Sequence, residues 1–174
     1  MNLPNILAFF RILLAPAMFI FLVERDLFGD IHYSWLDFFA ALIFVIASIT
    51  DFFDGYIARK WNQTTKLGAI LDPLADKMLV LAGFIGLMVI DRASAWAVFI
   101  ILSREFFITG LRVVAADEGK NVASTMAGKI KTVVQMIAIG FLIMNWPFAT
   151  QLLWLAVVLT VYSGYEYIRD YFKI

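Results

Sequence analysis

The feature that most constrains this chain is a succession of long apolar segments separated by short polar or Gly- and Pro-containing stretches. A helix needs about 20 mostly apolar residues to cross the hydrocarbon core of a bilayer. Because that core offers no water, each segment has to satisfy its own backbone hydrogen bonds, as a helix does. The sequence therefore predicts an all-α integral membrane bundle of about six transmembrane helices. The predicted helices span 5–24, 34–58, 69–91, 94–116, 124–146 and 149–170.

The amino-acid composition supports a membrane protein and excludes several other classes. Hydrophobic residues make up 63% of the 174 residues and charged residues only 16%, which is too little charge to cover a soluble globule. The formal net charge is zero, so no basic face for nucleic acid is expected. The chain has no cysteine, which excludes disulfides and thiolate metal ligands. We expect one membrane domain over 1–174, with the first apolar segment retained as a helix rather than cleaved as a signal peptide.

The basic residues are unevenly divided between the two sides of the membrane. If the N-terminus lies inside, the outer connections hold only Arg25 and Arg92. Lysine and arginine are enriched in cytoplasmic loops, so both termini are predicted to lie in the cytoplasm. The basic residues on that side are Arg59, Lys60, Lys66, Lys120, Arg169 and Lys173.

Two pairs of aspartates interrupt otherwise apolar segments. Asp51 and Asp54 lie near the end of the second segment. Asp72 and Asp76 lie near the start of the third. Spacings of three and four residues put the members of each pair on one face of a helix. A short loop joins the two segments, so the helices should pack antiparallel and bring the four carboxylates together.

These four carboxylates would repel each other strongly in a low dielectric, so they need cations. All-oxygen ligands suit Mg²⁺ or Mn²⁺, and the pattern indicates a divalent-metal site. The alternative is a set of structural salt bridges. That alternative is reasonable for one aspartate and weaker for four on two converging faces. The cations available for such pairing are Arg59, Lys60 and Lys77.

Four basic residues of the fourth and fifth segments lie near the same membrane side. Arginine binds phosphate through a two-pronged fork and lysine acts as a point charge, so an anionic substrate fits them better than a neutral one. The alternative for Lys129 and Lys131 is that they extend to lipid headgroups. Arg104 is not expected to pair with Glu105, because adjacent residues of a helix point apart. The four residues are Arg104, Arg112, Lys129 and Lys131.

The aspartates belong to a longer pattern of fixed residues at fixed spacing. That pattern resembles the defining motif of the CDP-alcohol phosphatidyltransferase family, and every fixed position is filled. Such a pattern is far more specific than a lone pair of aspartates. The pattern is Asp51-x2-Asp54-Gly55-x2-Ala58-Arg59-x8-Gly68-x3-Asp72-x3-Asp76.

Further segments extend the resemblance over most of the chain up to residue 136. The start of the chain resembles the usual N-terminal pattern of the family, and no longer cytoplasmic extension is expected before it. Segments in the second half resemble the branch that makes phosphatidylglycerol phosphate. The last apolar segment carries no motif of this kind. The segments are Asn2-Leu3-Pro4-Asn5 with Arg11, Ser103-Arg104-Glu105-Phe106, Gly110-Leu111-Arg112, and Gly128-Lys129-Ile130-Lys131-Thr132 with Gln135.

The resemblance implies a reaction and roles for individual residues. Phosphatidyl transfer from CDP-diacylglycerol to sn-glycerol 3-phosphate would give phosphatidylglycerol phosphate and CMP. The four aspartates would hold two Mg²⁺ or Mn²⁺ ions, with Asp76 also the general base. The enzyme would be a homodimer among the lipids of a bacterial inner membrane, with its site on the cytoplasmic side. The residues implied to bind CDP-diacylglycerol are Asn5, Gly55, Ala58, Arg59 and Gly68.

Other functions fit part of the same pattern. Within the family, the acceptor could instead be inositol phosphate, serine or phosphatidylglycerol. From another class, intramembrane carboxylates also mark the ion pathway of a divalent-cation transporter. The predicted acids gather at one membrane edge rather than along a path, and no broken-helix repeat is visible. Both features favour the transferase.

Overall fold

The computed structural model describes residues 3–60, 66–119 and 125–172, with side chains described for 6–50, 71, 74–119 and 125–172. All regular structure in these ranges is helical, which confirms the predicted all-α class. The helix bounds agree with the predicted segments to within a few residues. The elements are α1 (Leu3–Val23), the short 3-10 helix η1 (Arg25–Phe28), α2 (Tyr33–Lys60), α3 (Lys66–Val89), α4 (Ala95–Asp117), α5 (Met126–Ile143) and α6 (Ala149–Tyr171).

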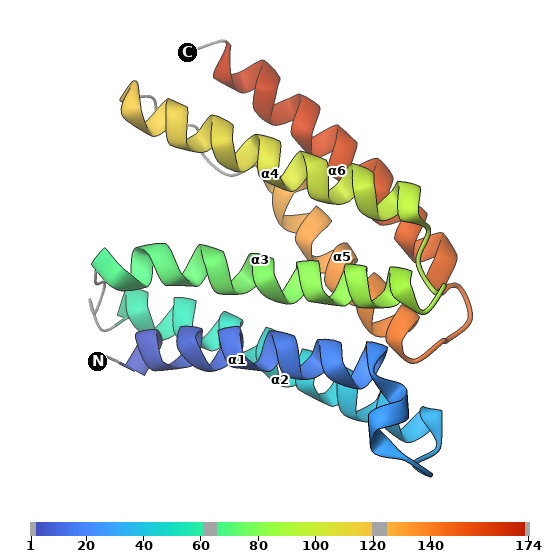
Figure 1. The fold of residues 1–174 in the computed structure, drawn as a ribbon. Coiled ribbons are helices and arrows are strands. Elements are labelled where there is room, and N and C mark those ends of the chain that lie inside the picture. Colours follow the sequence, from blue (N-terminus) through green and yellow to red (C-terminus); the bar gives the residue numbers. More distant parts are fainter. Residues whose placement is uncertain (1–2, 61–65, 120–124, 173–174) are drawn as a thin grey trace.

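Successive helices run in alternating directions, so both chain termini lie at the same end of the bundle (Figure 1). We call this the terminal end, and the opposite end, which holds η1, the distal end. α1 packs against α2 and α3, and α6 packs against α4 and α5. α5 also contacts α2 and α3, and therefore joins the two groups of helices (Figure 1).

The outer surface of the bundle is apolar on every helix. Large exposed side chains include Leu13, Leu74 and Val158. A soluble monomer rarely exposes an apolar surface this extensive, whereas lipid solvates it well. Within the described residues, three helices contain stretches long and apolar enough to cross a membrane, at Ile6–Val23, Tyr33–Thr50 and Met126–Ile143.

Three exposed tryptophans mark the distal end. Trp35 lies in the first turn of α2, Trp96 in the first turn of α4, and Trp146 just after α5. All three helix ends lie at the distal end of the bundle (Figure 1). Tryptophan is enriched at the membrane–water interface, so we expect the membrane surface at the distal end to lie at the level of these three residues.

The contact between α1 and α3 depends on small residues. A Cβ atom added at Gly86 would lie 3.0 Å from a side-chain carbon of Leu22. Transmembrane helices associate through such close packing, because apolar surface gains little by leaving lipid. Arg11 of α1 is fully buried.

A buried carboxylate ties the distal end together. Asp37 of α2 accepts hydrogen bonds from Arg25 at 2.6 Å and from Arg92 at 2.7 Å. Arg25 belongs to η1, and Arg92 lies in the turn between α3 and α4. Arg92 also donates to the carbonyl of Ile143 at the end of α5, at 2.5 Å. Asp37 therefore joins α2, η1 and the turn between α3 and α4, and Arg92 connects this group to α5.

We expect Asp37→Ala to destabilise the protein by about 2–4 kcal/mol, because it leaves two largely buried guanidinium groups without their shared partner. The melting temperature of the purified protein in detergent should fall by about 5 °C or more. Asp30→Ala is the matched control, because Asp30 is an exposed acid at the same end. An equal fall in melting temperature for the two substitutions would show that the ion pairs of Asp37 do not stabilise the protein.

Candidate active site

The two pairs of aspartates occupy matching heights on α2 and α3. Asp51 lies nine residues before the end of α2, and Asp76 ten residues after the start of α3. At 1.5 Å per residue, both are about 14 Å from the terminal end of their helix. Asp54 and Asp72 are each six residues, or about 9 Å, from the same ends. α2 and α3 contact each other and run antiparallel, as predicted (Figure 1).

Only one of these four aspartates has a described side chain. Asp76 is partly buried, and the side chains of Asp51, Asp54 and Asp72 lie outside the described residues. Among the side chains that are described, no group of three or more possible metal ligands occurs. The predicted metal site stays a prediction.

The residues predicted to bind CDP-diacylglycerol are placed by backbone alone. One lies in the first turn of α1, three in the last two turns of α2, and one in the first turn of α3, all near the terminal end. Their side chains lie outside the described residues. They are Asn5, Gly55, Ala58, Arg59 and Gly68.

A polar cavity of about 550 Å³ lies between α3, α4 and α5. Asp76 lines one wall, and all four predicted acceptor-binding cations line the others. Five basic and two acidic side chains are among its described lining residues, so positive charge is in excess by three. The charged residues are Asp76, Lys77, Arg104, Glu105, Arg112, Lys129 and Lys131.

Glu105 is the acidic partner of the cations on α4 and α5. It accepts a hydrogen bond from the Nζ of Lys131, whose side chain is only 5% exposed. This burial and pairing exclude the alternative that Lys131 extends to lipid headgroups. Nη1 of Arg104 lies 3.5 Å from Oε1 of Glu105. The expectation that these neighbours would not pair is also wrong, because both long side chains bend toward the same cavity.

Three further cations line the cavity in different ways. Lys77 of α3 donates a hydrogen bond to the hydroxyl of Thr109 at 2.5 Å. Arg112 is exposed, and its guanidinium carbon lies 5.3 Å from the ring centre of Tyr167. Lys129 is exposed. Lys77 is thus held by α4, whereas Arg112 and Lys129 present charge that water or a ligand can reach.

The roles of Glu105, Thr109 and Tyr167 were missed by the sequence analysis. A signal existed on α4, because Glu105, Thr109 and Arg112 are spaced by four and three residues and share one helical face. No comparable signal identified Tyr167, since an aromatic residue in a membrane helix is ordinarily packing or an interfacial anchor.

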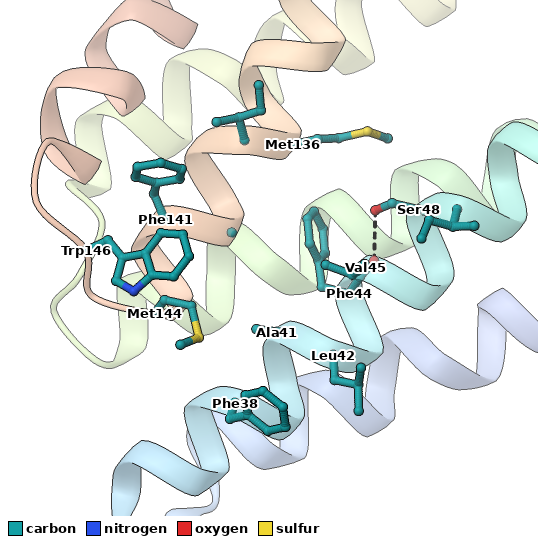
Figure 2. Close-up of a pocket in the computed structure, with 13 residues that line it drawn as sticks. Phe38, Ala41, Leu42, Phe44, Val45, Ser48, Met136, Phe141, Met144 and Trp146 are labelled. Carbon is teal, nitrogen blue, oxygen red and sulfur yellow. Dashed lines mark hydrogen bonds between the residues drawn. The ribbon is translucent and has the colours of Figure 1, made fainter.

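A second, larger hollow between α2 and α5 has a different chemistry. Its volume is about 810 Å³, and none of the described side chains that line it is charged. Figure 2 shows Phe38, Leu42 and Ser48 of α2 opposite Met136 and Phe141 of α5, with the Ser48 hydroxyl bonded to its own helix at 2.8 Å. The charged side chains described at the cavity between α3, α4 and α5 have no counterpart among the described residues of this groove.

Comparison with known proteins agrees with this geometry. The CDP-alcohol phosphatidyltransferase family model matches residues 1–162. A Bacillus subtilis (strain 168) protein named CDP-diacylglycerol–glycerol-3-phosphate 3-phosphatidyltransferase is 46% identical over 179 residues, with 95% of this chain and 93% of the relative covered. A relative of the same name from Escherichia coli (strain K12) is 38% identical over 178 residues, covering 96% of this chain and 93% of its own length. This integral membrane protein belongs to the CDP-alcohol phosphatidyltransferase family.

Proposed function

We propose that this protein transfers the phosphatidyl group of CDP-diacylglycerol to sn-glycerol 3-phosphate, giving phosphatidylglycerol phosphate and CMP. The observation that carries the proposal is a cavity lined by Asp76, in which the described basic side chains outnumber the acidic ones. The curated relatives bear the name of this reaction.

The excess of positive charge favours an anionic acceptor over a neutral one. A net positive charge at membrane depth is costly, so an anion that enters the cavity would stabilise it. Arg104 and Arg112 can each offer two N–H groups to a phosphate. Lys129 and Lys131 add point charges. Serine and inositol carry no net charge and would not offset the excess, whereas the phosphate of glycerol 3-phosphate would.

The proposed step is a direct displacement at phosphorus. The 1-hydroxyl oxygen of glycerol 3-phosphate forms a bond to the phosphorus that carries diacylglycerol. The bond from that phosphorus to the oxygen of CMP breaks, and CMP leaves with the electron pair. Asp76 accepts the hydroxyl proton, which a carboxylate within hydrogen-bond reach of the nucleophile can do.

Metal binding is proposed for the aspartates of α2 and α3. Matching heights on two antiparallel helices and an all-oxygen donor set fit Mg²⁺ or Mn²⁺. When bound there, the ions would supply charge neutralisation for the pyrophosphate. The residues that would hold them are Asp51, Asp54, Asp72 and Asp76.

The remaining assignments concern the lipid substrate and the assembly. Asn5, Gly55, Ala58, Arg59 and Gly68 are proposed to bind CDP-diacylglycerol, since they lie in the turns of α1, α2 and α3 at the terminal end, toward which the aspartates also lie. We place the active site and both termini on the cytoplasmic side of a bacterial inner membrane, where the basic residues favour that end. A homodimer is the assembly that the family resemblance implies.

The first test is CMP release by the purified protein in detergent with CDP-diacylglycerol, Mg²⁺ and one acceptor at a time. Release should require glycerol 3-phosphate, stop with EDTA and return with excess Mg²⁺ or Mn²⁺, because the carboxylates need cations to bind a pyrophosphate. Release with serine or inositol phosphate instead would overturn the acceptor. No release from folded protein with any acceptor would favour the cation transporter.

Asp76→Asn should lower kcat by a factor of about 100 or more, because the amide cannot accept the hydroxyl proton. Binding of CDP-diacylglycerol, measured by protection against thermal unfolding, should persist within a few-fold. Full activity in this variant would remove Asp76 from the role of general base.

Arg112→Ala should raise the KM for glycerol 3-phosphate by about tenfold, since one charge-assisted hydrogen bond is lost. The KM for CDP-diacylglycerol should change less than twofold. Arg169→Ala is the control, because Arg169 is exposed on α6 and pairs with Asp170 outside the cavity. Equal increases in both KM values would exclude Arg112 from the acceptor pocket.

A further inference from the structure

The last helix turns a polar stripe toward the rest of the bundle. Thr160, Ser163, Gly164, Tyr167 and Tyr171 are buried in the last three turns of α6. Their spacing of three, one, three and four residues places them on one helical face. α6 packs against α4 and α5, so this face meets the helices that carry the cationic cavity.

Ser163 holds one end of the Arg104 side chain. Its hydroxyl donates to the carbonyl of Thr160 at 3.1 Å, which leaves the oxygen lone pairs free to accept. Nη2 of Arg104 donates to that oxygen at 3.0 Å. The stripe is itself anchored, since Gln135 of α5 donates to the hydroxyl of Thr160 at 2.9 Å. The hydrogen of the Ser163 hydroxyl therefore points to the Thr160 carbonyl, and the oxygen accepts from Arg104.

Gly164 holds the stem of the same arginine. A Cβ atom added at Gly164 would lie 3.2 Å from Cγ and 3.3 Å from Nε of Arg104. The arginine thus lies directly against the backbone of α6. Its Nε is buried and has no hydrogen-bond partner within the described part of the chain. A methyl group at this position would displace the side chain.

Tyr167 backs the second arginine of the cavity. It lies one turn beyond Ser163 on the same face, and its ring centre is 5.3 Å from the guanidinium carbon of Arg112. A cation beside an aromatic face is attracted by the ring quadrupole. The ring is 2% exposed, so its position is set by packing rather than by the arginine.

We propose that the buried face of α6 orients both guanidinium groups toward the acceptor phosphate, with Ser163, Gly164 and Tyr167 as positioning residues. The inference rests on the proposed function, because it needs an acceptor phosphate in the cavity. An arginine fork binds phosphate best when its rotamer is already fixed, since less side-chain entropy is lost on binding. α6 thereby sets acceptor affinity without touching the reacting atoms.

The test is steady-state kinetics of purified Gly164→Ala and Ser163→Ala enzymes. Each should raise the KM for glycerol 3-phosphate by about tenfold. The turnover number and the KM for CDP-diacylglycerol should change less than threefold. Gly140→Ala is the matched control, because a Cβ atom there meets nothing within 4 Å; it should leave both KM values within twofold of wild type.

Two further variants separate positioning from folding. Tyr167→Phe keeps the ring and should behave as wild type, whereas Tyr167→Leu should raise the KM for glycerol 3-phosphate several-fold. In an Arg104→Ala background, Ser163→Ala should have no further effect on that KM, because its partner is gone.

Three results would overturn the inference. One is an unchanged KM for glycerol 3-phosphate in both Gly164→Ala and Ser163→Ala. Another is an equal loss for both substrates, which a general folding defect would cause. The third is full additivity of Ser163→Ala with Arg104→Ala. If the wild-type enzyme does not use glycerol 3-phosphate as an acceptor, the proposed function is wrong, and the inference that rests on it is wrong as well.

Discussion

An ionisable side chain within a bilayer needs an opposite charge or contact with water, and the arrangement of this bundle follows from that constraint. Glu105 is the clearest case among the described residues. It accepts from Lys131 and lies beside Arg104, so it joins α4 and α5 at the wall of the polar cavity. Glu105 therefore gives the buried cation of Lys131 a hydrogen-bonded carboxylate.

The two ends of the bundle meet the constraint in different ways. At the distal end, Asp37 binds Arg25 and Arg92 directly, and the spare donors of the arginines reach backbone carbonyls. Such a group is satisfied internally and acts as a structural tie. Among the described side chains that line the cavity between α3, α4 and α5, cations outnumber carboxylates. The proposal of an anionic acceptor rests on that difference.

Much of this organisation was predictable from local patterns. The helices follow from apolar length, and the antiparallel pairing of α2 and α3 follows from their short connection. The gathering of Arg104, Arg112, Lys129 and Lys131 around one cavity was anticipated from their shared membrane side. The pairing of Arg104 with Glu105 was not, because helical spacing describes Cβ directions and long side chains can bend away from them. The role of Asp37 was also missed, since nothing near it in sequence reveals two arginines from other segments.

The sequence by itself determined the class of protein and the helices, and it indicated the residues proposed to carry the chemistry, because membrane thickness and motif spacing are local properties of the chain. Only the tertiary structure decided which cations are held by carboxylates, which lie open in the cavity, and what supports them. Ser163, Gly164 and Tyr167 have no distinctive pattern of their own. Their relation to Arg104 and Arg112 exists only because α6 packs against α4, and contacts between helices far apart in sequence leave no local signature.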